Sequence, residues 1–261
     1  MIKLAVFDID GTLYDHKHQC IYESSIKAIK NLKKQGVKIV IATGRPHFSV
    51  NDELFAVEPD YLIGFNGHIV LNQENQIISS MRLDGEEVHK IYQHTVDHKW
   101  PAIFKFEDAC YIYEYGDAFV WIDLMKDAYE IFKFKKNQFD RHLSSPPVNI
   151  IVNTTPDQIE ELRVLCPNAD IIKGDGSDFE ILRKGVNKST GIEVIMQELK
   201  IDWEEVFAIG DSSNDKEMVS KAKYGCAVGD AIDELKAIAK YVTKPISEDG
   251  IAEIINKLFN K

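Results

Sequence analysis

Short apolar runs, each followed by polar residues and a glycine, recur at the start of the chain. Residues 3–8 form the first run, and residues 37–42 and 60–65 form the next two. Runs that are apolar at successive positions predict strands buried on both faces of a parallel sheet. Residues 22–34 place apolar positions at helical spacing and end near a glycine. This alternation of strand and helix predicts an α/β fold.

The same alternation of apolar runs and helices returns near the C-terminus. After a helix expected at residues 187–199, residues 205–209 and 224–228 are again apolar runs, and each ends in Gly-Asp. A last helix is expected at residues 251–258. In parallel α/β sheets, ligands bind beyond the carboxyl ends of the strands. We therefore expect the polar clusters that follow these strands to lie together.

The section between these two parts has a different pattern, in which short strands and helices are mixed. Residues 69–78 predict a hairpin, and residues 85–99 and 156–165 predict helices, with short strands around them. Its aromatic residues, which include Phe119 and Trp121, are expected to fill a core or line a substrate pocket. We interpret this section as a second α/β domain inserted into the first. The expected bounds are residues 1–82 and 184–261 for the core and residues 83–183 for the inserted domain.

Charge and composition narrow the classes of function. The 31 Lys and Arg residues against 42 Asp and Glu give a net charge of −11, which argues against a general binder of nucleic acid or anionic membranes. No apolar run approaches the length of a membrane span, and Asp8 and Asp10 interrupt the N-terminus too early for a signal peptide. The four cysteines are scattered without a C-x-x-C pair, so neither a zinc site nor a disulfide scaffold is indicated. We expect a soluble, reduced, cytoplasmic protein that is a monomer or homodimer.

Two carboxylates follow the first strand at alternate positions. Asp8 and Asp10 are separated by one apolar residue, and Gly11 lets the backbone turn sharply after them. Asp8 suits attack on phosphorus, and Asp10 suits protonation of the leaving oxygen and later activation of water. Mg²⁺ would bridge the attacking carboxylate and a phosphate oxygen. An Asp-Gly turn at a strand end is also a common structural feature, so these residues alone leave both interpretations open.

The segment Gly210-Asp211-Ser212-Ser213-Asn214-Asp215 follows another buried strand and carries two carboxylates and an amide. Such hard oxygen ligands suit Mg²⁺. Asp211 is the expected direct ligand, Asp215 binds directly or through water, and Asn214 orients substrate or a neighbouring carboxylate. The segment also fits the N-cap of a following helix, and the two roles are compatible.

Further residues at strand or helix ends complete a phosphate-binding set. Thr43 offers a hydroxyl, and Gly44 a backbone N–H, where a phosphoryl group can be held. Lys188 begins a predicted helix and can reach the same sheet edge. A single lysine near a helix start is more often solvated, so its assignment depends on the whole set. Arg45 and Asn66 follow strands that end at this edge and are expected to touch substrate or support the loop.

In order and content, these segments resemble the motifs of the haloacid dehalogenase-like superfamily of phosphohydrolases. The matching segments are Asp8-Ile9-Asp10-Gly11-Thr12-Leu13, Thr43-Gly44-Arg45, Lys188 and Gly210-Asp211-Ser212-Ser213-Asn214-Asp215. The pieces Thr-Gly-Arg-Pro, Phe-Asn-Gly and Gly-Val-Asn-Lys are similar to the Cof-type branch. The resemblance implies a Rossmann-like parallel sheet core with an inserted α/β cap that selects the substrate.

The resemblance also implies roles for individual residues. Asp8 is the nucleophile, and Asp10 is the acid and base. Thr43 and Lys188 hold the phosphoryl group. Asp8, Asp211 and the backbone carbonyl of Asp10 bind Mg²⁺. The side chain of Asp10 argues against the dehalogenase branch, which has no comparable need for an acid at that place.

Together these patterns predict a Mg²⁺-dependent phosphatase that acts through an aspartyl-phosphate on Asp8. The expected substrate is a small phosphorylated metabolite, such as a sugar phosphate, a nucleotide or a cofactor phosphate. Two alternatives stay open: a phosphomutase, which passes phosphate to a second hydroxyl, and a non-catalytic sensor of phosphometabolites.

Other polar residues carry weaker predictions. His94 and His98 lie four apart on a predicted helix, but with no third ligand nearby in the sequence they are interpreted as surface residues. His16 and His18, just after the nucleophile loop, are interpreted in the same way. Residues 175–177 are expected either to approach the leaving group or to form a plain turn.

Overall fold

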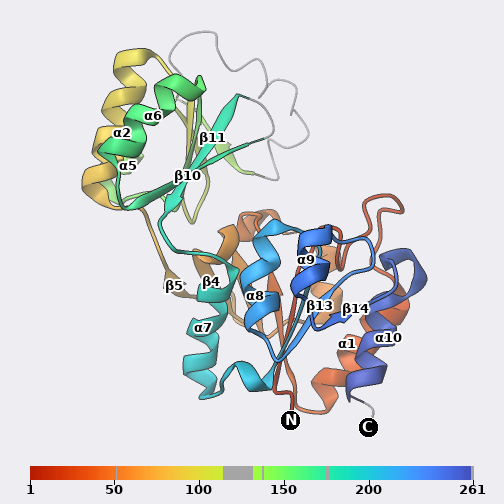
Figure 1. Ribbon diagram of the computed structural model, residues 1–261. Helices are drawn as coiled ribbons and strands as arrows, with labels where there is room; N and C mark the ends of the chain where they lie inside the picture. Colours follow the sequence, from red (N-terminus) through yellow and green to blue (C-terminus); the bar gives the residue numbers. More distant parts are fainter. Residues whose placement is uncertain (51, 114–131, 137, 175–176, 260–261) are drawn as a thin grey trace. The chain divides into compact units, whose positions relative to one another are not determined.

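The chain forms two compact units in the computed structural model (Figure 1). The structure describes residues 1–50, 52–113, 132–136, 138–174 and 177–259. The first unit comprises Met1–Ser79 and Asn187–Lys261, and the second, inserted between them, comprises Ser80–Val186. The sequence predicts these boundaries at 82/83 and 183/184. Predictions for Phe119, Trp121 and residues 175–176 lie outside the described residues.

A sheet that has eight strands among the described residues forms the centre of the first unit, in the order β14-β13-β12-β1-β2-β3-β4-β5. The pairs from β14 to β3 are parallel, whereas β3 and β4 are antiparallel. Its strands are β1 (Leu4–Phe7), β2 (Lys38–Ala42), β3 (Tyr61–Gly64), β4 (Ile69–Asn72), β5 (Ile77–Ser80), β12 (Val206–Gly210), β13 (Tyr224–Ala227) and β14 (Tyr241–Val242). Because β1 lies between β12 and β2, its carboxyl end is near the middle of the sheet edge.

Helices cover both faces of this sheet (Figure 1). The helices are α1 (Glu23–Lys34), α7 (Lys188–Leu199), α8 (Lys216–Lys221), α9 (Asp233–Ile238) and α10 (Gly250–Phe259). Apolar residues of α7, α8 and α9 join Val206 and Ala208 of β12 in one buried cluster. Phe207 points to the opposite face, where its ring centroid lies 5.7 Å from that of Phe259 in α10. Helix α10 packs beside α1, so the sheet is the middle of three layers.

Short 3₁₀ helices connect these elements. They are η1 (His47–Ser49), η2 (Asp52–Val57), η3 (Phe65–Gly67), η4 (Trp203–Glu205), η5 (Ser213–Asp215) and η6 (Ile246–Glu248). Two of them, η3 and η5, follow β3 and β12 at the carboxyl edge of the sheet and carry residues of the candidate site. No helix in the described part of the chain is both long and apolar enough to cross a membrane.

The second unit has its own sheet, with six strands among the described residues in the order β10-β11-β9-β6-β7-β8. Its pairs are antiparallel except for β7 with β8. Its elements are α2 (Gly85–His98), β6 (Ala102–Lys105), β7 (Cys110–Tyr113), β8 (Phe134–Lys135), α5 (Arg141–Ser144), β9 (Asn149–Asn153), α6 (Pro156–Leu165), β10 (Ala169–Lys173) and β11 (Asp178–Arg183). Ile91 of α2 and Leu162 of α6 pack with Phe104 of β6 in a separate core. The α/β class predicted from the sequence is confirmed.

Candidate active site

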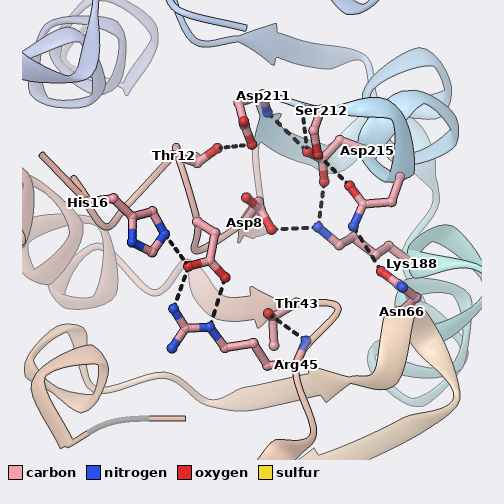
Figure 2. Close-up of polar contacts among 12 residues, drawn as sticks. Asp8, Thr12, His16, Thr43, Arg45, Asn66, Lys188, Asp211, Ser212 and Asp215 are labelled. Atoms are coloured by element: carbon pink, nitrogen blue, oxygen red, sulfur yellow. Dashed lines mark hydrogen bonds and ion pairs between the residues drawn. The ribbon is translucent and has the colours of Figure 1, made fainter. Parts of the chain in front are cut away.

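Asp8 lies directly after β1, at the carboxyl end of a central strand of the first unit. Its N–H donates to the Ile209 carbonyl at 3.1 Å, which continues the ladder to β12 by one residue. Only 5% of the residue is exposed. Its Oδ1 accepts a hydrogen bond from Lys188 Nζ at 2.5 Å (Figure 2). The sheet therefore holds the Asp8 carboxylate in a fixed, buried position.

Lys188 is the first residue of α7, and its side chain has no exposed surface. Its Nζ lies between the carboxylates of Asp8 and Asp215, 2.5 Å and 2.6 Å from their Oδ1 atoms. The helix begins here because the Asn187 side chain accepts from the backbone N–H groups of Ser189 and Thr190. Lys188 is thus a buried ion-pair partner and not a solvated lysine.

Gly67 fixes the position of this helix start. It has a φ of +105°, and a Cβ atom on it would lie 1.9 Å from the carbonyl oxygen of Asn187. Only a residue without a side chain allows the backbone of η3 to approach α7 this closely. The Asn-Gly pair at the end of β3 therefore positions Lys188 from across the sheet edge.

Asp215 and Asp211 complete the cluster from the end of β12. Asp215 is fully buried, and its Oδ2 accepts from the backbone N–H groups of Asp211 and Ser212 at 3.0 and 3.1 Å. Asp211 Oδ1 accepts from Thr12 Oγ1 at 3.3 Å. Carboxylate oxygens of Asp8, Asp211 and Asp215 all lie within 4.8 Å of one another. Because β12 is the parallel neighbour of β1, residues that follow the two strands meet.

The electrostatics of this cluster favour a bound cation. Burial raises the pKa of Asp8 to about 8. The positive charge of Lys188 opposes this rise, and the negative charge of Asp215 adds to it. Burial, together with the charge of Asp215, also raises the pKa of Asp211. Burial disfavours the charge of Lys188, but the neighbouring Asp8 and Asp215 outweigh it and raise its pKa. Three carboxylates share one ammonium, and this excess of oxygen donors and negative charge fits a hard divalent cation such as Mg²⁺.

Asp10 occupies a separate, half-exposed position beside this cluster. Its two oxygens face the guanidinium of Arg45, with Nε donating to Oδ2 at 2.8 Å and Nη2 contacting Oδ1. His16 Nε2 lies 2.7 Å from the same Oδ1. Arg45 and His16, both labelled in Figure 2, each contact this carboxylate. Arg45 therefore orients Asp10 by a paired contact, which a guanidinium makes and an ammonium does not.

The remaining predicted residues line the edge between β2, β3 and β12. Thr43 is buried, and its Oγ1 accepts from the Arg45 backbone N–H at 3.1 Å. A Cβ on Gly44 would lie 3.1 Å from Asn66 Oδ1, so this loop and η3 touch. Asn66 Oδ1 accepts from Asn214 Nδ2 at 2.9 Å. The two asparagines bridge the ends of β3 and β12.

The structure thus brings the sequence-predicted residues to one edge of the first unit in three contact groups. Asp8, Lys188, Asp211 and Asp215 form the first, Asp10 and Arg45 the second, and Asn66 and Asn214 the third. Two partners, Thr12 and Ser212, were given no role of their own from the sequence, and His16 was interpreted as a surface residue: its side chain is 60% exposed, but it also contacts Asp10. Their closeness to the nucleophile and metal motifs was the available signal.

The fold and this edge define a class of proteins: α/β enzymes with an acidic site at the carboxyl ends of a parallel sheet. Within that class, the model of the haloacid dehalogenase-like hydrolases matches residues 5–255. The chain belongs to this family, in its Cof-type branch. It is a phosphatase, the activity that the names of several relatives give.

Three relatives, two found by sequence and one by solved structure, match this chain along nearly their whole length. YkrA of Bacillus subtilis, which carries a provisional phosphatase name, is 31% identical, with 98% of this chain and 97% of YkrA aligned. A phosphoglycolate phosphatase of Methanothermobacter thermautotrophicus is 26% identical over 96% of both chains. The solved structure of the subclass IIB sugar phosphatase BT4131 is 29% identical, covers 99% of both chains and has a TM-score of 0.80.

Proposed function

We propose that this phosphatase hydrolyses small phosphorylated metabolites through an aspartyl-phosphate on Asp8, with Mg²⁺ as its cofactor. The observation that supports this most directly is the position of the Asp8 carboxylate. It is buried at the end of a central strand, contacts Lys188 and lies within reach of two further carboxylates. Nucleophile, cation and metal ligands are the groups that phosphoryl transfer to a carboxylate requires.

In the first half of the reaction, an oxygen of Asp8 attacks phosphorus and the bond from phosphorus to the leaving oxygen breaks. Asp10 donates a proton to that oxygen, so that the product leaves as an alcohol. Arg45 and His16 hold the Asp10 carboxyl group in position for this transfer.

In the second half, water attacks the phosphorus of the aspartyl-phosphate. Asp10 accepts a proton from that water, and the bond between phosphorus and the Asp8 oxygen breaks. Inorganic phosphate is released and the Asp8 carboxylate is restored. Lys188 stays beside Asp8 throughout and balances the negative charge that passes between carboxylate and phosphate.

Asp8, Asp211 and the backbone carbonyl of Asp10 are the proposed direct ligands of Mg²⁺. When bound, Mg²⁺ supplies a positive charge that offsets the phosphate and the surrounding carboxylates. Asp215 already accepts from Lys188 and from two backbone N–H groups. We therefore assign Asp215 the role of positioning Lys188, with any contact to the cation made through water.

Thr43, Gly44, Arg45, Asn66 and Asn214 are the proposed phosphate- and substrate-binding residues around this centre. The second unit is the proposed cap that selects the substrate. Two relatives support a small phosphate ester as substrate, since their names specify a sugar phosphatase and a phosphoglycolate phosphatase.

Phosphate release from a panel of sugar phosphates, nucleotides and cofactor phosphates, with and without Mg²⁺, tests the proposal. Asp8→Asn is expected to lower the rate by roughly 10³-fold or more, while circular dichroism shows an intact fold. Removal of Mg²⁺ with EDTA should abolish release, and added Mg²⁺ should restore it. Full activity of Asp8→Asn would exclude the covalent mechanism.

The same panel separates hydrolysis from the two alternatives. A phosphomutase would return an isomeric sugar phosphate and little inorganic phosphate. A sensor would bind an ester, as measured by calorimetry, without turning it over. Either result would overturn the proposed hydrolysis, whatever the activity of the Asp8→Asn variant.

A further inference from the structure

The second unit contains a cluster of side chains that the proposed reaction does not use. His94 and His98 lie one turn apart on α2, and Glu161 lies on α6, which packs beside α2. Ligand atoms of these three residues lie within 4.8 Å of one another. Among the described residues, this is the one such group outside the proposed active site.

We propose that His94, His98 and Glu161 form a binding site for a transition metal ion of the Zn²⁺ type. Two imidazole nitrogens and one carboxylate are a donor set that binds Zn²⁺ in proteins and leaves a fourth position for water. The acidic cluster of the first unit offers only oxygen donors, which suit Mg²⁺ instead. The two sites therefore select different ions.

The spacing of the first two donors fits this ion. His94 Nε2 lies 3.1 Å from Glu161 Oε2. Donors placed about 2.0–2.1 Å from a tetrahedral Zn²⁺ lie about 3.3 Å from each other. An ion can thus take the place of the hydrogen bond between these two groups, with little movement of either helix.

The third donor is already oriented. His98 Nδ1 donates to the carbonyl oxygen of His94 at 3.0 Å, which leaves the lone pair of His98 on Nε2. A ligand imidazole usually donates its second nitrogen to such an oxygen, which fixes its tautomer and ring direction. The ring centroids of His94 and His98 are 4.6 Å apart at an interplanar angle of 33°. The two rings therefore lie side by side.

The surroundings allow an ion to enter and hold the rings in place. The Glu161 side chain is 63% exposed, and that of His94 is 17% exposed, so the ion is reached from solvent. Trp100 is buried beneath the pair, with its ring centroid 5.4 Å from His94 and 5.2 Å from His98. A bound ion would tie α2 to α6, both of which cover the second unit's core.

The test titrates Co²⁺ and Zn²⁺ into the full chain, stripped of metal and then supplied with excess Mg²⁺. One ion per chain is expected at this site, with Co²⁺ giving the visible absorption of a nitrogen-ligated ion and changing Trp100 fluorescence. His98→Ala and Glu161→Gln should each lower the affinity about tenfold or more, since even the loss of a ligand's supporting partner has effects of that size. Phosphatase activity with Mg²⁺ should be unchanged in both variants.

Matched variants keep the result interpretable. His89→Ala removes an exposed histidine of the same helix that lies outside the cluster, and should leave the affinity unchanged. Asp211→Asn identifies any ion held at the acidic site of the first unit. An affinity that is insensitive to His98→Ala and Glu161→Gln, or that is lost only in Asp211→Asn, would overturn the proposal. The ion pair between His94 and Glu161 would then serve only to join the helices.

Discussion

Lys188 shows how strongly single residues are constrained at the active site. Its ammonium has no exposed surface and lies between two buried carboxylates. A buried charge is tolerated only when partners compensate for its lost hydration. The dependence is mutual, because Asp8 and Asp215 would otherwise be two like charges in a dry site. Lys188 therefore contributes to stability as well as to the proposed chemistry.

Replacing Lys188 by Met, which keeps the length of the side chain but removes its charge, should lower the free energy of unfolding by about 3–5 kcal/mol in metal-free buffer. Urea unfolding measures the change. Adding Asp8→Asn to Lys188→Met should recover part of the loss, because one uncompensated carboxylate is removed. Lys221→Ala, which breaks a solvent-exposed pair with Glu193, is the control and should change stability by less than about 1 kcal/mol. Equal effects of the two lysine variants would contradict this account.

At the scale of the element, two backbone segments approach each other closely where η3 meets the start of α7. Gly67→Ala should lower stability by about 3 kcal/mol or more, because the added Cβ meets the Asn187 carbonyl in a conformation already unfavourable for alanine. It should also lower kcat, since Lys188 moves with the helix. Thermal unfolding and phosphatase assays provide the measurements.

Gly36→Ala is the matched control for this prediction. Gly36 has a φ of +85°, but nothing lies within 4 Å of a Cβ placed on it. Its replacement should cost only the backbone strain, about 1–2 kcal/mol, with kcat unchanged. If both variants behaved alike, the strain and not the contact with α7 would explain the effect of Gly67→Ala.

The loop after β1 is held by a second buried carboxylate. Asp15 accepts from the side chain of His18 at 2.8 Å, from Tyr22 OH at 2.8 Å and from the backbone N–H groups of Lys17 and His18. These hydrogen bonds, that from the His18 ring above all, hold the pKa of Asp15 well below its usual range. The His18 side chain is 48% exposed, as interpreted from the sequence, and it also holds this loop through its contact with Asp15.

A carboxyl group whose pKa is lowered by folding stabilises the folded state at pH values above its unfolded-state pKa. This contribution is lost as the pH falls from the unfolded-state pKa through the folded-state pKa. The wild-type chain should therefore be more stable than Asp15→Asn by a constant amount near neutral pH. The difference should shrink from about pH 5 downward, since an unfolded aspartate has a pKa of about 3.9. Urea unfolding at a series of pH values measures it. A difference that stayed constant down to about pH 2 would show that the Asp15 charge is not the cause.

The regular elements were predictable where a pattern extends over enough residues. The runs at β1, β2, β3 and β12 are apolar at successive positions, and α2 spans several turns. Helices α8 and α9 have six residues each, too few for a period to show. A helix after residues 210–215, where α8 lies, is predicted only from its N-cap, and no helix is predicted at α9. Strand β11 also has no predicted counterpart, although its alternation of polar and apolar residues was a readable signal.

The site residues could be predicted from their places at strand ends, because parallel topology brings those ends to one edge of the sheet. The pairing of their side chains could not be predicted, because it depends on the geometry between segments far apart in the sequence. Arg45 contacts Asp10 from 35 positions away, and Glu161 contacts His94 from 67 positions away. The interpretation of His94 as a surface residue rested on the absence of a third ligand nearby in sequence, which α6 supplies in space.

For the whole molecule, two separate cores imply that the two units respond to ligands independently. Mg²⁺ bound to the first unit at 100 times its dissociation constant should add about 2.7 kcal/mol to the stability of that unit. Hydrogen exchange should then slow in β1 and β12 and stay unchanged in β9 and β11. Zn²⁺, if bound as inferred, should give the opposite pattern. Equal protection of both sheets by Mg²⁺ would show that the units unfold together.

The insertion also dictates the order in which the chain can fold during synthesis. β1 pairs with β12, with Leu4 opposite Val206, and Asp8 meets Lys188 across 180 positions. The second unit is continuous in sequence and is synthesised before Lys188 and β12. Contacts of such long range form slowly. The acidic site can therefore assemble only in chains extended past Asp215, and every shorter nascent chain carries Asp8 without the complete set of Lys188, Asp211 and Asp215.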